Sequence, residues 1–320
     1  VAEPSDAQAS ADMADASRDL TAKLVKLVQA MQEIKSEEDS RVNSYEIFVN
    51  QKQTHIRNSR GVDVTFSGFG CEIEVVTNSR TDDHEIEIYK DLRFSDKSAE
   101  KIIAEVRGMF HTGRQRLNAV PTRQNEHADV LLTGNAVGSF FQYFAMHTNA
   151  SYQYMGVAKA KIGEAITGAD ADPLNIRLVP TLDGSAKNVP YDETGMPAAE
   201  RVLFENGICR SYWGSLQHAH YIGMKNTTSM NNMVVEGGSK TLDELRSMPH
   251  IEITDFSAFD MDAVSGTCGG EIRLAYESDG TISHPTTSGS LSARYDDVLK
   301  NLTFSKETQQ LNNRVVPCAV

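Results

Sequence analysis

The sequence contains few cysteines and no long hydrophobic run, and both absences narrow what the protein can be. No stretch approaches the ~20 consecutive apolar residues of a membrane-spanning helix, and residues 1–5 lack the charged and apolar regions of a signal peptide. The cysteines are widely separated, without a C-x-x-C pair, which excludes a disulfide-dense framework and suits a reduced compartment; they are Cys71, Cys209, Cys268 and Cys318. We therefore predict a cytoplasmic protein.

Positive charge is also scarce. The chain has 31 Lys and Arg residues against 44 Asp and Glu residues, a formal net charge of -13 at pH 7. This acidic excess is spread through the chain, so it repels phosphate backbones and anionic lipid head groups. We expect no direct nucleic acid partner and no membrane partner, and we interpret the charge as favouring solubility.

Repeats and nucleotide-binding patterns are missing as well. No internal repeat with a solenoid-like period is visible, and Gly266, Gly269 and Gly270 lack the strand-to-helix context of a phosphate-binding loop. What remains is an ordinary globular composition, with 40% hydrophobic and 23% charged residues. The length allows one large domain or two modest ones.

The first part of the chain changes from helical to strand periodicity. Residues 1–16 are rich in Ala, Ser and Asp and predict a flexible start. Apolar residues at helical spacing predict an amphipathic helix over Ser17–Ile34. From Ser44 to Leu92 the period becomes two, with turn formers at 58–61 and 78–83, which predicts an antiparallel meander.

A second helix is expected after this meander. Helical spacing returns over Ser98–Phe110, with Asp96 as the expected N-cap. The polar run Arg114–Glu126, broken by Pro121, predicts a loop. We assign residues 17–125 to an N-terminal portion that follows the flexible start.

The second half predicts short strands separated by turns. One more helix is expected over Ala293–Leu302, and the strand candidates are Leu174–Leu182, Arg201–Arg210, Ile251–Thr254 and Glu271–Tyr276. Residues 126–320 are therefore assigned to a β-rich C-terminal domain. The predicted fold class is α+β, with largely antiparallel sheets and a few segregated helices.

The most informative segment is Val130–His147, where a short apolar run and a Thr-Gly-Asn turn precede an aromatic helix. On this helix Tyr143 and His147 share one flank and Gln142 lies on the other. The segment is placed and shaped like the site helix of a metallopeptidase. A zinc helix of the H-E-x-x-H kind needs two His ligands and a Glu base, and this arrangement is absent from the segment.

Other residues suggest weaker candidates. His218 and His220 would lie on one side of a strand and, with His147 or Cys268, could hold a metal. We interpret the two His as surface residues, Cys268 as a small residue in a tight turn, and Trp213 as a core aromatic. Asp192 is interpreted as a turn cap rather than a proton donor.

Several blocks of the sequence resemble the TldD/PmbA family, also called TldE and long labelled modulators of DNA gyrase. The likeness runs from about Ser44 to the C-terminus. Its blocks are residues 129–147, residues 189–197 with the motif D-x-x-G-x-P, residues 203–208 with the motif E-N-G, residues 265–272, and Val315–Pro317.

The resemblance implies which positions matter. TldD-type members carry H-E-x-x-x-H on this helix and look like zinc peptidases, whereas PmbA-type members lack the motif and partner them. By register, Gln142 stands at the first His, Tyr143 at the Glu and His147 at the second His. The two motif His are ~140° apart on a regular helix and need a bend to share a metal, and Met146 stands where a Gly could ease that bend. The chain is therefore nearer the PmbA type, with no cofactor expected.

We therefore expect a non-catalytic subunit or degenerate homologue of a zinc metallopeptidase, acting in peptide maturation or degradation. The resemblance implies a homodimer or a heterodimer with a TldD-type subunit. Full-length members have a further N-terminal α/β portion, so a trimmed or short member is expected. Two alternatives stay open: a hydrolase with zinc at His147, His218, His220 or Cys268, and a module that binds an extended peptide at a sheet edge.

Overall fold

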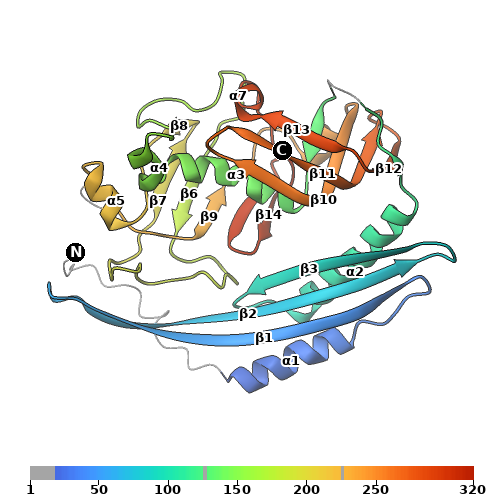
Figure 1. Cartoon of the computed structure of the whole chain (residues 1–320), viewed down its shortest axis with the longest axis horizontal. Helices are drawn as coiled ribbons and strands as arrows, with labels where there is room; N and C mark the ends of the chain where they lie inside the picture. The colour runs from blue at the N-terminus through green and yellow to red at the C-terminus, as the bar shows by residue number, and fades with distance from the viewer. Residues whose placement is uncertain (1–18, 125–127, 225–226) are drawn as a thin grey trace.

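A long curved sheet forms the first unit of the molecule (Figure 1). The computed structural model describes residues 19–124, 128–224 and 227–320, so the expected flexible start at 1–16 lies outside the described residues. Strands β1 (Ser40–Arg57), β2 (Asp63–Arg80) and β3 (Glu85–Phe94) pair antiparallel in the order β1-β2-β3. The predicted meander is confirmed, and the turn after β1 is held by Asn58, whose side chain accepts from the Val62 amide (3.2 Å).

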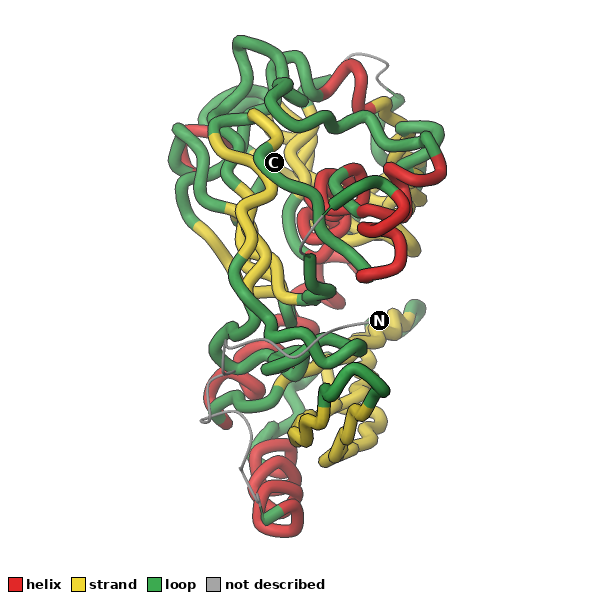
Figure 2. The backbone as a smooth tube through the Cα atoms, turned by 90° about the vertical axis from the view of Figure 1, so that its left-hand side faces the viewer, coloured by secondary structure: helices red, strands yellow, loops and turns green. Residues whose placement is uncertain are grey.

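Two helices bury one face of this sheet. Helix α1 (Leu20–Gln32) begins at its N-cap Asp19, and α2 (Ala99–Leu117) begins at Ser98. Both contribute to one apolar cluster with alternate residues of the strands; the buried members are Leu27, Met31, Cys71, Ile73, Val75, Leu92, Phe94, Ile102, Val106, Met109 and Phe110. Figure 2 shows this unit below the rest of the chain.

The ends of α2 differ from the sequence prediction. Its N-cap is Ser98 and not Asp96, which instead pairs with Lys23 of α1. The helix also continues to Leu117, through the first part of the predicted loop, because its polar residues find partners. Arg114 pairs with Asp39 at 3.2 Å, and Arg116 lies 3.8 Å from Asp255.

The second unit contains two sheets. One has the order β4-β12-β11-β10-β5, with β13 paired to β11, and the other has the order β14-β15-β9-β6-β7-β8. Most pairs are antiparallel, and β10–β5, β12–β4 and β15–β9 are parallel. Their bounds are β4 Val120–Pro121, β5 Val130–Leu132, β6 Ile176–Val179, β7 Arg201–Glu205, β8 Ile208–Cys209, β9 Asn232–Val235, β10 His250–Asp262, β11 Thr267–Ser278, β12 Ser283–Thr287, β13 Ser290–Arg294, β14 Thr308–Leu311 and β15 Arg314–Pro317.

Helix α3 (Asn135–His147) lies at the centre of this unit. Its aromatic residues belong to one core cluster with apolar residues of both sheets, including Ile176, Phe204 and Ile253. Shorter helices lie around it: α4 (Ala150–Met155), α5 (Leu216–Tyr221), α6 (Leu242–Arg246) and α7 (Tyr295–Val298). The predicted α+β class with mainly antiparallel sheets is confirmed.

The predicted helix over Ala293–Leu302 is mostly wrong. Its first two residues complete β13, which pairs with β11, and only one helical turn, α7, follows. Cross-strand hydrogen bonding outweighs local helical spacing here, because β13 and the Gly-rich part of β11 lie directly side by side.

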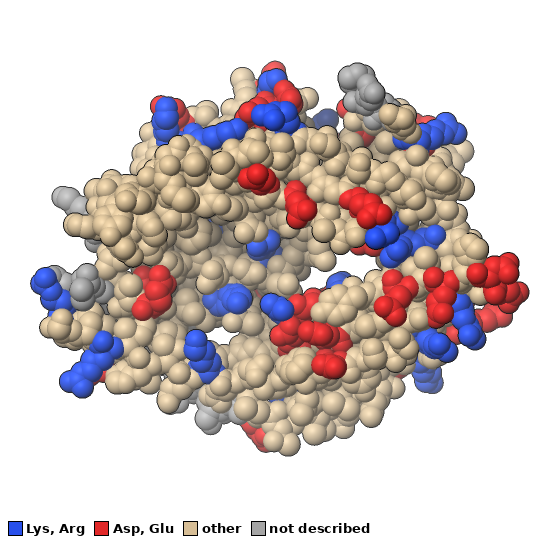
Figure 3. Space-filling view, viewed as in Figure 1, with Lys and Arg blue, Asp and Glu red and all other residues tan. Residues whose placement is uncertain are grey.

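The two units touch where the family-like D-x-x-G-x-P block meets the tip of the β1–β2 hairpin. Asp192 caps this loop as predicted, since its carboxylate accepts from the amides of Thr194 (2.9 Å) and Met196 (3.0 Å). Gly195 has φ 84°, and a Cβ there would lie 2.5 Å from Val62. Only glycine lets the loop pack this closely. Figure 3 shows a hollow between the two units near the centre of the view.

None of the described helices is both long and apolar enough to cross a membrane.

Candidate functional site

The site helix α3 begins at a glycine that the fold requires. Gly134 is its N-cap with φ 65°, and a Cβ at this position would lie 2.8 Å from the carbonyl oxygen of Thr254 in β10. Any residue other than glycine would be strained here, because the backbone has a positive φ and the neighbouring strand leaves no room for a Cβ. The Thr-Gly-Asn turn seen in the sequence therefore fixes where α3 leaves the sheet.

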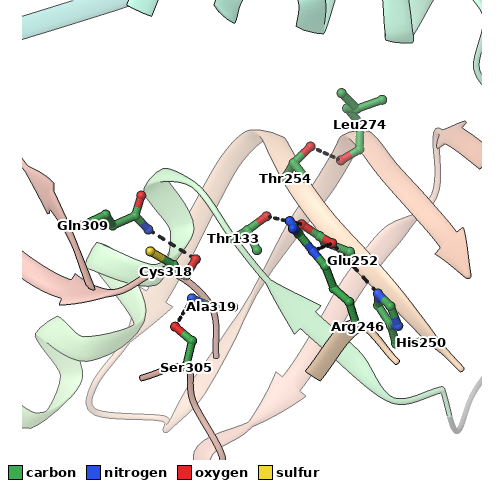
Figure 4. Close-up of polar contacts among 10 residues, drawn as sticks. All are labelled: Thr133, Arg246, His250, Glu252, Thr254, Leu274, Ser305, Gln309, Cys318 and Ala319. Atoms are coloured by element: carbon green, nitrogen blue, oxygen red, sulfur yellow. Dashed lines mark hydrogen bonds and ion pairs between the residues drawn. The ribbon is translucent and has the colours of Figure 1, made fainter. Parts of the chain in front are cut away.

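A buried carboxylate stabilises the same junction (Figure 4). Glu252 of β10 accepts two parallel hydrogen bonds from Arg246, at 2.8 and 2.7 Å, and a third from Thr133 at 3.2 Å. His250 lies 3.9 Å from the same carboxylate. A bidentate Arg–Glu pair satisfies a buried charge well, so this cluster ties α6 and the end of β5 to β10.

Gln142, at the position of the first motif His, faces β15. Its side-chain oxygen accepts from Nη2 of Arg314 at 2.8 Å, while Nη1 of Arg314 donates to the Gly138 carbonyl at 3.1 Å. An amide oxygen bound to a guanidinium is a poor zinc ligand, and the adjacent positive charge opposes a metal cation. This position does not fit zinc.

Tyr143, at the position of the Glu base, is fully buried. Its ring stacks on Tyr295 with centroids 3.7 Å apart and planes 5° apart. Burial raises the pKa of the Tyr143 hydroxyl, so the neutral phenol is favoured. Tyr295 is held in turn by its own hydroxyl, which donates to the Phe140 carbonyl at 2.9 Å. Tyr143 is therefore part of an aromatic core and is not placed as a base.

His147, at the position of the second His, is also enclosed. Its Nδ1 accepts from the Lys159 amide at 3.0 Å, and its ring centroid lies 4.2 Å from that of Tyr143. Burial, with a smaller effect of the Lys159 charge, lowers the pKa of His147 to about 4. The neutral imidazole is thus the form at pH 7.

The other two His candidates, His218 and His220, are not on a strand, and that prediction is wrong. His218 and His220 lie on α5, which begins at its N-cap Ser215. Residues two apart on a helix point ~200° apart, so the pair cannot share one face. His218 contacts the Ser215 hydroxyl at 2.8 Å instead.

Cys268 lies on β11, beside Tyr295, rather than in an exposed turn. Burial raises the pKa of its thiol to about 11, so it is protonated at neutral pH. It lines a cavity of about 1070 Å³ with Phe140 and Ile272; Gln142, Tyr143 and His147 are absent from the described lining. Within residues 19–124, 128–224 and 227–320, no group of three His, Cys, Asp or Glu side chains is arranged to hold a metal ion.

Trp213 is partly buried against the core, and its indole nitrogen donates to the Ala145 carbonyl at 2.7 Å. Two contact residues that the sequence did not indicate are Arg314, which binds Gln142, and Tyr295, which stacks on Tyr143. Arg314 had one signal, a single charge at the start of the short apolar strand Arg314–Pro317. Tyr295 had none, since its stacking partner is far away in the chain.

Comparisons with known proteins agree with this architecture. A family model described as the PmbA/TldA metallopeptidase C-terminal domain matches residues 125–320. No curated protein matches the chain.

Three solved structures are similar to the whole described fold. TldE from Thermococcus kodakarensis has 18% identity and a TM-score of 0.72, covering 99% of this chain and 77% of that chain. A candidate modulator of a DNA gyrase from Thermotoga maritima has 17% identity and a TM-score of 0.78, with the same coverage of 99% and 77%. A candidate modulator of DNA gyrase from Bacteroides thetaiotaomicron has 15% identity and a TM-score of 0.74, covering 95% and 71%. At these identities the likeness shows a shared fold.

Proposed function

Because the chain belongs to the TldD/PmbA family of metallopeptidase-related proteins, we propose that it is a PmbA-type member without peptidase activity of its own. In this proposal it acts in peptide maturation or degradation. It does so as a subunit that pairs with a metal-bearing TldD-type partner, or as a homodimer.

One observation carries the proposal: each motif position of α3 is committed to a contact within the protein. Gln142 binds Arg314, Tyr143 stacks on Tyr295, and His147 accepts from the Lys159 amide. A catalytic zinc needs three protein ligands and an open position for water. These side chains supply neither the ligands nor the base, so no hydrolytic step can be assigned to them.

The directions in which the motif residues point from α3 support the same proposal. Gln142 and His147 are five residues apart, which separates them by ~140° on a regular helix. Tyr143 and His147 are fully buried, whereas Gln142 is only partly covered. The only His of the three therefore points into the core and away from the flank on which Gln142 lies.

The test is metal content and peptide cleavage of the purified protein alone. We expect less than stoichiometric zinc by elemental analysis, and intact unstructured peptides by mass spectrometry after incubation with added zinc. His147→Ala should leave the metal content unchanged. Stoichiometric zinc together with cleavage by the protein alone would contradict the proposal.

A second candidate is a peptide-binding module that acts without a partner. The observation that favours it is that β3 ends its sheet, with β2 on one side only. An edge strand offers unpaired backbone groups to an extended peptide. Peptide pull-down by the protein alone would support this module, whereas capture that requires a TldD-type subunit would support the obligate subunit.

A further inference from the structure

Arg314 is a half-buried cation bound only to neutral acceptors. Its two hydrogen bonds go to the Gly138 carbonyl and to the Gln142 amide oxygen, and they use two of the five donors of a guanidinium. Among the described residues no acidic side chain forms an ion pair with it, and burial lowers its pKa. A partly desolvated charge without a counterion is costly, so an anion bound here would be stabilising.

The surroundings of Arg314 hold the guanidinium in one place. Gly138 and Gln142 are four residues apart and lie on the same face of α3. A Cβ at Gly138 would lie 3.5 Å from Nη1 and 3.7 Å from Cδ of Arg314. These are ordinary van der Waals distances, so the arginine packs directly against the backbone of α3, and its bond to the Gln142 amide oxygen orients the guanidinium.

The chain just before Arg314 reaches the first unit. In the β14–β15 turn, the side chain of Asn312 accepts from the Arg93 amide of β3 at 3.4 Å. Gln310 of β14 donates to the Asp183 carbonyl at 2.7 Å. Arg314 therefore follows directly after a turn that joins the two units.

We propose that Arg314, positioned by Gly138 and Gln142, binds a carboxylate of a peptide ligand. The planar guanidinium can give a carboxylate two parallel hydrogen bonds, which a neutral amide cannot match. The carboxylate is either the C-terminus of the peptide or an Asp or Glu side chain. This inference rests on the proposed function in taking a peptide as the ligand.

The experiment measures peptide affinity by fluorescence anisotropy with three labelled decapeptides of Ala, Ser and Thr. One has a free C-terminal carboxylate, one is its amide, and one is the amide with a central Asp. We expect at least one carboxylate peptide to bind at least about tenfold more tightly than the plain amide, as for other charge-assisted pairs. The arm that shows the difference identifies the source of the carboxylate.

Variants separate binding from a structural role. Arg314→Met should abolish the preference and Arg314→Lys should keep part of it. Gln142→Glu places a carboxylate of the protein itself beside Arg314, so it should raise Tm and abolish the preference for carboxylate peptides. If Arg314 had only a structural role, the same variant would raise Tm and leave peptide affinity unchanged. The control Arg210→Met removes an exposed arginine that pairs with Glu205 at 2.8 Å and should keep the preference.

Equal or undetectable binding of all three peptides to the wild type would overturn the inference, as would a preference retained in Arg314→Met. Mass spectrometry of the peptides after each titration keeps the two proposals apart. Cleaved peptide would contradict the proposed function and leave the Arg314 site standing. Intact peptide with no carboxylate preference would contradict the Arg314 site alone.

Discussion

The imidazole of His147 is enclosed by Tyr143, Tyr152 and the chain around Lys159. Because the histidine is buried, its protonation makes the free energy of unfolding depend on pH. Folding lowers its pKa from 6.5 to about 4, so between these pH values the unfolded state binds more protons than the folded state. The free energy of unfolding should therefore fall as the pH falls through this window, and His147 contributes no further change below it.

For His147→Asn we expect a smaller loss of stability between pH 6.5 and pH 4 than for the wild type. Titration of His147 should lower the free energy of unfolding of the wild type by about 3 kcal/mol over this pH range. The variant has no imidazole at this position and should not show this contribution. The Asn oxygen can still accept from the Lys159 amide, which makes it a conservative control. Urea unfolding at several pH values measures the difference, and parallel pH profiles of the two proteins would contradict it.

At the scale of residues the sequence singled out three positions on α3 and did not indicate the side chains that surround them. Gln142, Tyr143 and His147 were found from helical register and family blocks. Their partners Arg314 and Tyr295 follow more than a hundred positions later, and no local pattern links residues so far apart. Side-chain contacts across such separations depend on strand pairing, which periodicity does not report.

At the scale of elements, α2 shows how packing overrides propensity. It contains two glycines, and alanine favours a helix over glycine by about 0.5–1 kcal/mol. Gly108 is exposed, with no atom within 4 Å of an added Cβ. Gly113 is buried, and an added Cβ would lie 2.2 Å from the hydroxyl oxygen and 2.7 Å from the Cβ of Ser79 in β2.

We therefore expect Gly108→Ala to stabilise the protein by about 0.5–1 kcal/mol. Gly113→Ala should destabilise it by about 1–3 kcal/mol, because α2 must move away from the sheet. Thermal and urea unfolding of both variants measure the two effects. A stabilising Gly113→Ala would show that α2 does not pack on β2 as closely as described.

Competition between local sequence pattern and tertiary contacts also explains which elements were predicted correctly. Long periodic segments such as α1, α2 and the β1–β3 meander were recognised, since each repeats its pattern many times. The short segments at 216–221 and 293–302 were assigned wrongly. Few residues carry the pattern there, and a Ser215 N-cap or pairing with β11 decides the outcome.

For the whole molecule, the net charge of -13 sets the expected behaviour toward nucleic acids. On the face shown in Figure 3, the described Lys and Arg side chains are interspersed with Asp and Glu and do not form a continuous basic stripe. Nonspecific DNA binding depends on neutralising phosphates with basic side chains. The chain has fewer basic than acidic residues, so it lacks the excess positive charge that such binding requires.

We expect no retardation of duplex DNA in a gel-shift assay at either low or physiological salt, with a basic DNA-binding protein as the positive control. Low salt is the stringent condition, because electrostatic attraction is strongest there. Binding that weakens steeply with added salt would contradict this expectation and point to a local basic surface.

By itself the sequence determined the fold class, the family and the absence of the H-E-x-x-x-H motif, because these depend on local periodicity and on residue identity at aligned positions. Tertiary structure alone decided that Gln142 meets a half-buried arginine, that Tyr143 stacks on Tyr295 and that His147 is neutral. Burial and long-range contacts set those properties, and both arise only when α3 is enclosed between two sheets.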